Sequence, residues 1–227
     1  MSALTLPLIQ HFQAHADPEQ ARGMSAYLRH QFQFFGIKAP QRVLLSQAYL
    51  NTHGQPSDLT EQLKLARACY QAPYRELQYF VQDWLKPQAK RLGPEHLPLI
   101  EELIQTQPWW DTVDFLAPTL AGEILAKNRA LWEAYPERWI RHESLWLRRS
   151  AIIFQLKYKE RTEDEVLFRY CLSQAQEREF FIQKAMGWAL RERSKTRPQL
   201  IRDFVTANEL PALTRREALK WLKSKER

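Results

Sequence analysis

An acid and a tryptophan stand at helical spacing in the middle of the chain. Four residues follow an i, i+4, i+7, i+11 row, the spacing of one helix face: Trp110, Asp114, Ala117 and Ala121. The small residues would leave an open ledge beside the aromatic ring, with the carboxylate one turn away. Pro118 lacks a backbone N–H, so the carbonyl of Asp114 loses its usual partner. We therefore expect the helix to be distorted just after the acid, and a functional site is one cause of such distortion.

Two further polar residues follow Asp114 at a constant interval along the chain. Arg149 lies 35 residues after Asp114, and Lys184 lies 35 residues after Arg149. Lys184 and Trp188 also repeat the pairing of a polar residue with a tryptophan at i, i+4 spacing. A period of about 35 to 45 residues is typical of HEAT- or TPR-like solenoids. In such a stack equivalent positions line up along one surface, usually the concave one.

The same residues allow a purely structural interpretation. An ion pair between Asp114 and Arg149 would hold two repeats together without taking part in chemistry. Trp110 and Trp188 would then be ordinary core residues, because tryptophan is highly buried on average. The spacing alone leaves both interpretations open.

The elements that must position these residues are predicted to be helices throughout. The chain has only 6 glycines, no G-x-G-x-x-G or G-K-[ST] motif and no strand alternation with hairpin turns. Helix starts are predicted from capping residues and prolines at Asp17-Pro18, Pro40, Asp58, Gly93-Pro94, Thr162 (as a capping box with Glu165), Pro198 and Thr214. No linker composition interrupts the chain, so residues 1–227 are predicted to form a single all-α domain.

Positive charge is concentrated at the C-terminal end. Residues 184–227 carry 12 Lys/Arg and 5 Asp/Glu, whereas residues 1–183 carry 21 of each. A polyanion partner would use this asymmetry, because Lys and Arg neutralise phosphates and release counterions. The alternative is a basic segment that is merely solvated.

Several classes of protein find no support in the sequence. Cys69 and Cys171 are far apart and are expected to be small core residues in a reducing compartment. The 6 histidines form no H-E-x-x-H motif or Cys/His cluster, so neither a metal nor another cofactor is expected. The first residues resemble no secretory signal, and no apolar run reaches the about 18 residues of a membrane span. We expect a cytoplasmic protein.

The segments around the candidate residues resemble those of a known family. PWWDTVDFLAPT, SLWLRRSAIIFQLKYK and EFFIQKAMGWALRERSKT look like the signature segments of the AlkD-type DNA alkylation-repair glycosylases, which are bacterial HEAT-like-repeat proteins. MSAYLRHQFQFFGIKAPQR and NELPALTRREALKWLK are also similar, so the resemblance covers nearly the whole chain. It implies a right-handed solenoid of HEAT-like helical repeats with a concave basic DNA-binding face. Ala39 departs from the family pattern, where a polar residue is expected, so the resemblance does not imply a DNA contact at this peripheral position.

The resemblance implies an activity and its residues. The family removes N3- and N7-alkylated purines, such as 3-methyladenine and 7-methylguanine, by hydrolysing the N-glycosidic bond in base excision repair without base flipping. Asp114 matches the catalytic acid, Trp110 and Trp188 match the active-site tryptophans, and Arg149 matches the arginine expected to bind phosphate and pair with the acid. A related subfamily has lost such residues and shows no glycosylase activity, so their presence favours an enzyme.

The implied partner is double-stranded DNA containing alkylated bases, bound by a monomer. The residues expected to contact DNA are Tyr27, Arg148, Lys157, Lys184, Arg191, Lys195 and Arg216. Two alternatives remain: a HEAT-like scaffold for protein partners, and a DNA-structure-binding protein without catalysis. A helix-hairpin-helix glycosylase is disfavoured because the chain has no L-P-G-[VI]-G hairpin.

Overall fold

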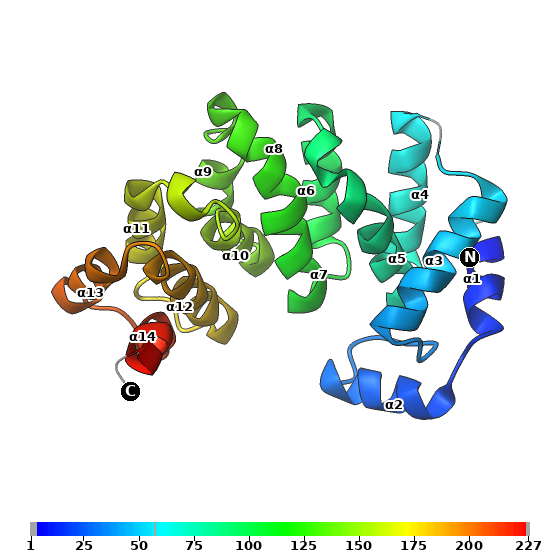
Figure 1. Ribbon diagram of the computed structural model, residues 1–227, viewed down its shortest axis with the longest axis horizontal. Helices are drawn as coiled ribbons and strands as arrows, with labels where there is room; N and C mark the ends of the chain where they lie inside the picture. Colours follow the sequence, from blue (N-terminus) through cyan, green and yellow to red (C-terminus); the bar gives the residue numbers. More distant parts are fainter. Residues whose placement is uncertain (1–3, 57, 226–227) are drawn as a thin grey trace. The chain divides into compact units, whose positions relative to one another are not determined.

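The chain is helical, as predicted. The computed structural model describes residues 4–56 and 58–225, shown as a ribbon in Figure 1. Among these residues the only β-type pairing is an isolated bridge between Gln33 and Tyr74. Internal contacts divide the chain into two compact units, Met1–Ala89 and Lys90–Arg227. The all-α fold class is therefore confirmed, while the single domain over residues 1–227 stays a prediction.

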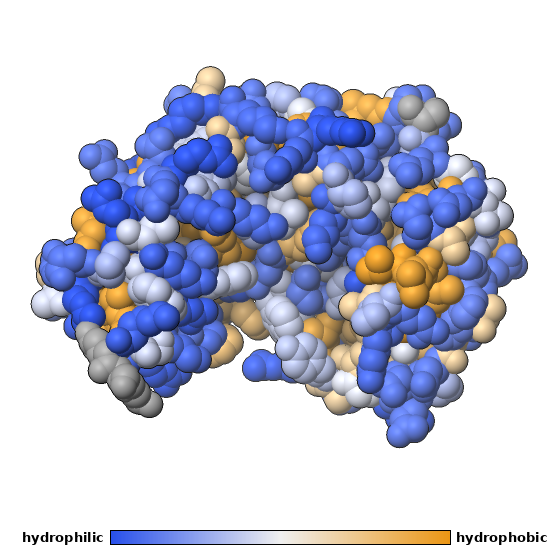
Figure 2. Space-filling view, viewed as in Figure 1, coloured by the Kyte–Doolittle hydropathy of each residue, from blue (hydrophilic) through white to orange (hydrophobic). Residues whose placement is uncertain are grey.

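Within its described residues, 4–56 and 58–89, the first unit contains five α-helices. They are α1 (Leu6–Gln13), α2 (Pro18–Tyr27), α3 (Ala39–His53), α4 (Leu59–Gln71) and α5 (Arg75–Leu85). Asp17 and Asp58 accept backbone N–H groups at the starts of α2 and α4, which confirms both predicted caps. Figure 2 shows an apolar patch over α3, the helix on which Val43 and Leu44 are 47% and 72% exposed. This helix therefore buries only part of its apolar side chains.

The second unit contains the remaining α-helices. They are α6 (Leu97–Gln105), α7 (Trp110–Phe115), α8 (Gly122–Lys127), α9 (Pro136–Trp139), α10 (Leu145–Ile153), α11 (Asp164–Ser173), α12 (Phe180–Ser194), α13 (Pro198–Ala207) and α14 (Ala212–Lys225). Short 3-10 helices occur at Lys86–Arg91, Pro94–His96, Arg129–Leu131 and Lys159–Arg161. Along the chain α7 contacts α10, α10 contacts α12, and α12 contacts α14. These four helices form one row, which is the arrangement that the 35-residue interval predicts.

Most predicted helix starts are confirmed, and two are wrong. Prolines stand in the first turn of α3 and α13, and Pro94 opens a 3-10 turn before α6. Thr162 forms no capping box, because α11 begins at Asp164 and the N–H of Glu163 donates to Gln155 Oε1 at 2.8 Å instead. Thr214 does not begin α14, which starts at Ala212. Its hydroxyl is buried and donates to the carbonyl of Gln183 on α12, 3.0 Å away.

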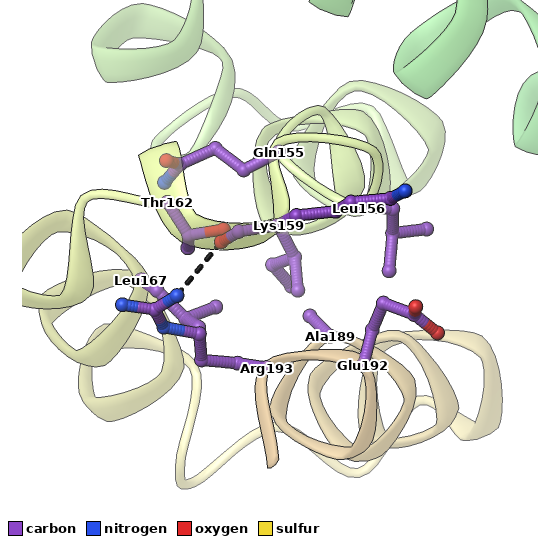
Figure 3. A pocket seen from close by; sticks show the side chains of 9 residues that line it. Gln155, Leu156, Lys159, Thr162, Leu167, Ala189, Glu192 and Arg193 are labelled. Atoms are coloured by element: carbon purple, nitrogen blue, oxygen red, sulfur yellow. Dashed lines mark hydrogen bonds between the residues drawn. The ribbon is translucent and has the colours of Figure 1, made fainter. Parts of the chain in front are cut away.

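A buried arginine fastens α12 to the preceding elements. Arg193 donates to both carboxylate oxygens of Asp164, at 2.6 and 2.8 Å, with side chains 3% and 22% exposed. Figure 3 shows the same guanidinium reaching the backbone oxygen of Lys159, 2.7 Å away. The cavity beside it is small, about 10 Å³. This ion pair therefore links α12 to α11 beside a cavity that has room for little more than a water molecule.

Three further sequence-based expectations bear on the fold. Cys69 and Cys171 are buried and free, as predicted for core residues, and burial raises the pKa of both thiols. Among residues 4–56 and 58–225, no group of three or more potential ligands is placed to hold a metal ion. In the same described part of the chain, no helix combines the length and apolar character needed to cross a membrane.

Candidate active site

The helix that carries Asp114 changes its geometry directly after the acid. α7 ends at Phe115, and Leu116–Ala121 continues it as a fully buried π-helical segment that includes Pro118. A proline within a helix removes a hydrogen bond and crowds the preceding turn, and a wider π turn accommodates this. The predicted distortion therefore takes the form of a π-helical segment.

Asp114 is held by Arg149 across the contact between α7 and α10. Arg149 Nε lies 2.7 Å from Asp114 Oδ1, and Nη2 lies 2.7 Å from Oδ2. The Arg149 side chain is only 5% exposed, and its Nη1 donates to the carbonyl of Phe181 on α12. The predicted pairing is confirmed. Because this buried guanidinium is occupied on all three nitrogens, the geometry supports a role in orienting Asp114 more than in binding phosphate.

The environment of the Asp114 carboxyl group is partly desolvated. Burial raises the pKa of Asp114 above its ordinary value, although the hydrogen bonds and charge of Arg149 act in the opposite direction. The neighbouring Asp111 raises the pKa further. A carboxylate in such surroundings interacts strongly with any positive charge brought close to it, because little water screens the pair.

Asp114 faces a pocket of about 280 Å³ within the second unit. The pocket is lined by Trp110, Asp114, Arg149, Phe180, Phe181, Lys184, Trp188, Arg191 and Glu217. All four predicted catalytic residues and two of the predicted DNA-binding cations are thus brought together. Such a combination of aromatic walls, a fixed carboxylate and cations is suited to a ligand with both positive and negative groups.

Three lining residues were missed by sequence reasoning, and two of them are phenylalanines. Phe180 begins α12 and is 51% exposed, and it precedes Lys184 and Trp188 by one and two turns. This i, i+4, i+8 row was the signal that could have found it. Phe181 packs against Trp109 and Trp146, with ring centroids 5.2 Å apart in each pair. It therefore supports the pocket wall from the core side.

The third missed residue is an acid on the last helix. Glu217 is buried, and its two carboxylate oxygens contact Lys184 Nζ at 3.1 Å and Arg191 Nη1 at 2.6 Å. Burial alone would raise the pKa of Glu217, but the hydrogen bonds and charges of these two cations hold it below its ordinary value. Glu217 follows Lys184 by 33 residues, close to the interval of the other site residues.

The remaining predicted DNA-binding residues do not line this pocket. Arg148 pairs with Glu177 at 2.8 Å, and Lys157 donates to the hydroxyl of Thr119 at 2.7 Å. Lys195 and Arg216 are exposed, with Lys195 2.6 Å from Glu192 and Arg216 beside a surface groove along α14. Tyr27 belongs to the first unit and is 73% exposed. DNA contacts by these residues stay predictions.

Comparison with known proteins agrees with this arrangement. Residues 8–222 match the sequence profile of the DNA alkylation repair enzyme family. A solved structure described as a predicted DNA alkylation repair enzyme from Enterococcus faecalis is 34% identical, with a TM-score of 0.83 over 91% of this chain and 96% of that one. A search of curated proteins gives no match.

More distant structures share the fold. AlkD2 from Streptococcus mutans is 19% identical, with a TM-score of 0.59 over 78% of this chain and 87% of that one. The smu.31 protein from Streptococcus mutans UA159 is also 19% identical, with a TM-score of 0.58 over 78% and 90% of the two chains. These likenesses confirm the AlkD-type helical-repeat fold. The match over residues 8–222 shows that the chain belongs to the DNA alkylation repair enzyme family.

Proposed function

We propose that the protein is a monofunctional DNA glycosylase that hydrolyses the N-glycosidic bond of N3- and N7-alkylated purines, including 3-methyladenine and 7-methylguanine. The observation that carries the proposal is the Asp114 carboxylate, held by two hydrogen bonds from buried Arg149 and facing an open pocket with Trp110 and Trp188. The family membership supports a role in DNA alkylation repair. DNA is the corresponding partner.

The proposed reaction needs no general acid. An alkylated purine is already cationic, so it leaves with the electron pair of the C1′–N bond as a neutral base. Positive charge then develops on the deoxyribose, as in other glycosidic hydrolyses. Asp114 stabilises this charge in a partly desolvated site, where a fixed carboxylate is most effective. Water adds to C1′ and loses a proton, which leaves an abasic site and an intact strand.

The other lining residues would hold the lesion strand. The faces of Trp110 and Trp188 attract the positive character of the sugar and the damaged base. Lys184 and Arg191 neutralise nearby phosphates. Because the aromatic lining residues come from helices and not from an intercalating loop, we favour recognition from the backbone side without base flipping. The protein would act as a monomer in the cytoplasm.

A second ion pair in the chain allows the purely structural interpretation of Asp114 and Arg149 to be compared with a functional one. Arg193 and Asp164 form the same two-bond arrangement, and their side chains are equally shielded, at 3% and 22% exposed against 5% and 19% for Arg149 and Asp114. The Arg193 pair adjoins a cavity of about 10 Å³, whereas the Asp114 pair faces one of about 280 Å³. Access to a ligand distinguishes the two, and this favours a functional role for Asp114.

The proposal is tested by incubating the protein with methylated duplex DNA and measuring free bases by mass spectrometry. We expect 3-methyladenine or 7-methylguanine to appear faster than by spontaneous loss, with the strand left uncut. DNA binding without release of either base would instead identify a non-catalytic DNA-binding protein. Absence of salt-dependent DNA binding would favour a scaffold for protein partners.

A further inference from the structure

The last helix supplies a polar residue to the row that carries the site. α7, α10, α12 and α14 contact one another in sequence and carry Asp114, Arg149, Lys184 and Glu217. Each residue stands about one repeat after the previous one, and all four line the same pocket. α14 is therefore part of the pocket wall and does more than close the end of the fold.

The close packing of α14 on α12 places Glu217 in the pocket. A Cβ added to Gly187 would lie 2.5 Å from the Cβ of Glu217 and 3.0 Å from the carbonyl oxygen of Thr214, so any larger residue would require α12 or α14 to shift. The Thr214 hydroxyl also donates to the carbonyl of Gln183, 3.0 Å away. These contacts bring the Glu217 side chain between Lys184 and Arg191.

Glu217 joins two cations that point at the same pocket. Its Oε1 contacts Lys184 Nζ and its Oε2 contacts Arg191 Nη1, so one carboxylate restrains both side chains. Lysine and arginine each lose substantial rotamer freedom when they are fixed. A buried acid that pre-positions them removes that loss from DNA binding, while its own negative charge weakens the attraction for phosphate.

We propose that Glu217 is a positioning residue that holds Lys184 and Arg191 as a paired phosphate clamp beside Asp114. The proposal rests on the glycosylase function proposed above. The clamp sets where the lesion strand lies relative to the carboxylate, and it does so at some cost in affinity. Loss of Glu217 therefore slows base release while leaving the attraction for DNA intact or stronger.

The test uses the full chain with Glu217→Gln, which keeps the shape and removes the charge. We expect base release from a 7-methylguanine duplex at saturating protein to slow by about tenfold, a typical effect of a misplaced substrate. Affinity for unmodified duplex should stay equal or increase. The matched control is Glu137→Gln, because Glu137 also contacts two cations, Arg169 and Arg141, away from the pocket. It should change neither quantity.

Opposite directions of rate and affinity distinguish positioning from a structural role. Release within twofold of the wild type, or parallel losses of release and affinity, would overturn the proposal. If Glu217→Gln does not fold, Glu217→Asp keeps the negative charge on a shorter side chain that holds the two cations less well. It should slow base release by a smaller factor and leave the affinity for unmodified duplex unchanged. An unchanged rate in a folded Glu217→Asp protein would then contradict the clamp.

A second measurement tests the clamp through DNA affinity alone and does not depend on catalysis. In unmodified DNA, the affinity lost through Lys184→Ala should differ by about threefold or more between the wild-type and Glu217→Gln backgrounds. Equal losses would refute the clamp whether or not base release occurs. Absence of release by the wild type, together with this coupling, would refute the glycosylase function and leave the phosphate clamp standing.

Discussion

Replacing Asp114 by asparagine separates the chemical role of the acid from its packing role. Asparagine keeps the size and one acceptor oxygen, but it removes the negative charge and one of the two acceptors for Arg149. The free energy of unfolding is subject to opposing effects. Arg149, which is 5% exposed, loses a charged partner, whereas the unfavourable burial of the Asp114 carboxylate is relieved.

The net effect on stability should be small and the effect on rate large. We expect a loss of about 1–2 kcal/mol in unfolding free energy, and a chain of this size then loses about 2–8 °C in Tm. Two unit charges about 4 Å apart interact by about 4 kcal/mol at an effective dielectric constant of about 20. Incomplete charge on the sugar and partial neutralisation by Arg149 reduce this to about 2–3 kcal/mol, or about 30- to 150-fold in rate.

The assay is single-turnover release of 7-methylguanine from an oligonucleotide duplex, performed well below the Tm of every variant. Asp164→Asn is the matched control, because it disrupts the equivalent pair with Arg193 away from the pocket. It should lose similar stability and keep its release rate within about twofold. The reasoning is refuted if Asp114→Asn releases base within threefold of the wild type, or if both variants slow equally.

The pocket geometry also predicts a pH dependence, a salt dependence and an effect on stability. Burial raises the pKa of Asp114, so base release should fall with decreasing pH at values above the ordinary 3.8, and this acid limb should vanish in Asp114→Asn. Since the raised pKa makes the folded state bind a proton more readily than the unfolded state, the contribution of Asp114 to the unfolding free energy should increase as pH falls and decrease as pH rises. A calorimetric series over pH measures this contribution. Lys184→Ala and Arg191→Ala should each reduce the slope of log affinity against log salt by about 1, and unchanged slopes would exclude phosphate contacts. Gly187→Ala should lower the unfolding free energy by about 1–3 kcal/mol in urea, because its Cβ would meet Glu217 at 2.5 Å; full stability would contradict that close approach.

The residues grouped around Asp114 could be predicted from the sequence because the repeat interval is regular. Equivalent positions in adjacent helices of a stack meet on one surface, and Asp114 and Arg149 are in fact hydrogen-bonded across 35 residues. Pro118 likewise predicted a local distortion, since its missing N–H acts on its own helix whatever the tertiary contacts. What the sequence left open was whether the pair faces a pocket, which depends on how the side chains of α12 are arranged.

The wrong helix-cap predictions fall where tertiary contacts compete with the conformational preference of the local sequence. Threonine is a common helix cap, but neither Thr162 nor Thr214 caps a helix here. The side chain of Gln155 accepts the N–H of Glu163, and the backbone carbonyl of Gln183 accepts the hydroxyl of Thr214. Arg148 stands next to Arg149 in sequence and points to Glu177 instead of the pocket, because adjacent residues on a helix face different directions. These partners are set by the tertiary structure, so local sequence patterns do not predict them.

The close approach of α14 was also invisible to local pattern. Gly187 is an isolated glycine within a helix, which sequence rules treat as a weak destabilising feature. Its role appears only when Glu217 is seen packed against it. The acid that joins Lys184 and Arg191 therefore could not be assigned from composition or periodicity, although its 33-residue offset from Lys184 was a usable hint.

In the proposed reaction, Asp114 stabilises positive charge on the sugar. The most direct measurement compares the affinity of the protein for two abasic-site duplexes, one with a cationic pyrrolidine and one with a neutral tetrahydrofuran in place of the deoxyribose. We predict that the wild type binds the cationic duplex about tenfold or more tightly than the neutral one, and that Asp114→Asn loses this preference. Equal affinities in the wild type, or a preference that survives in Asp114→Asn, would contradict the account.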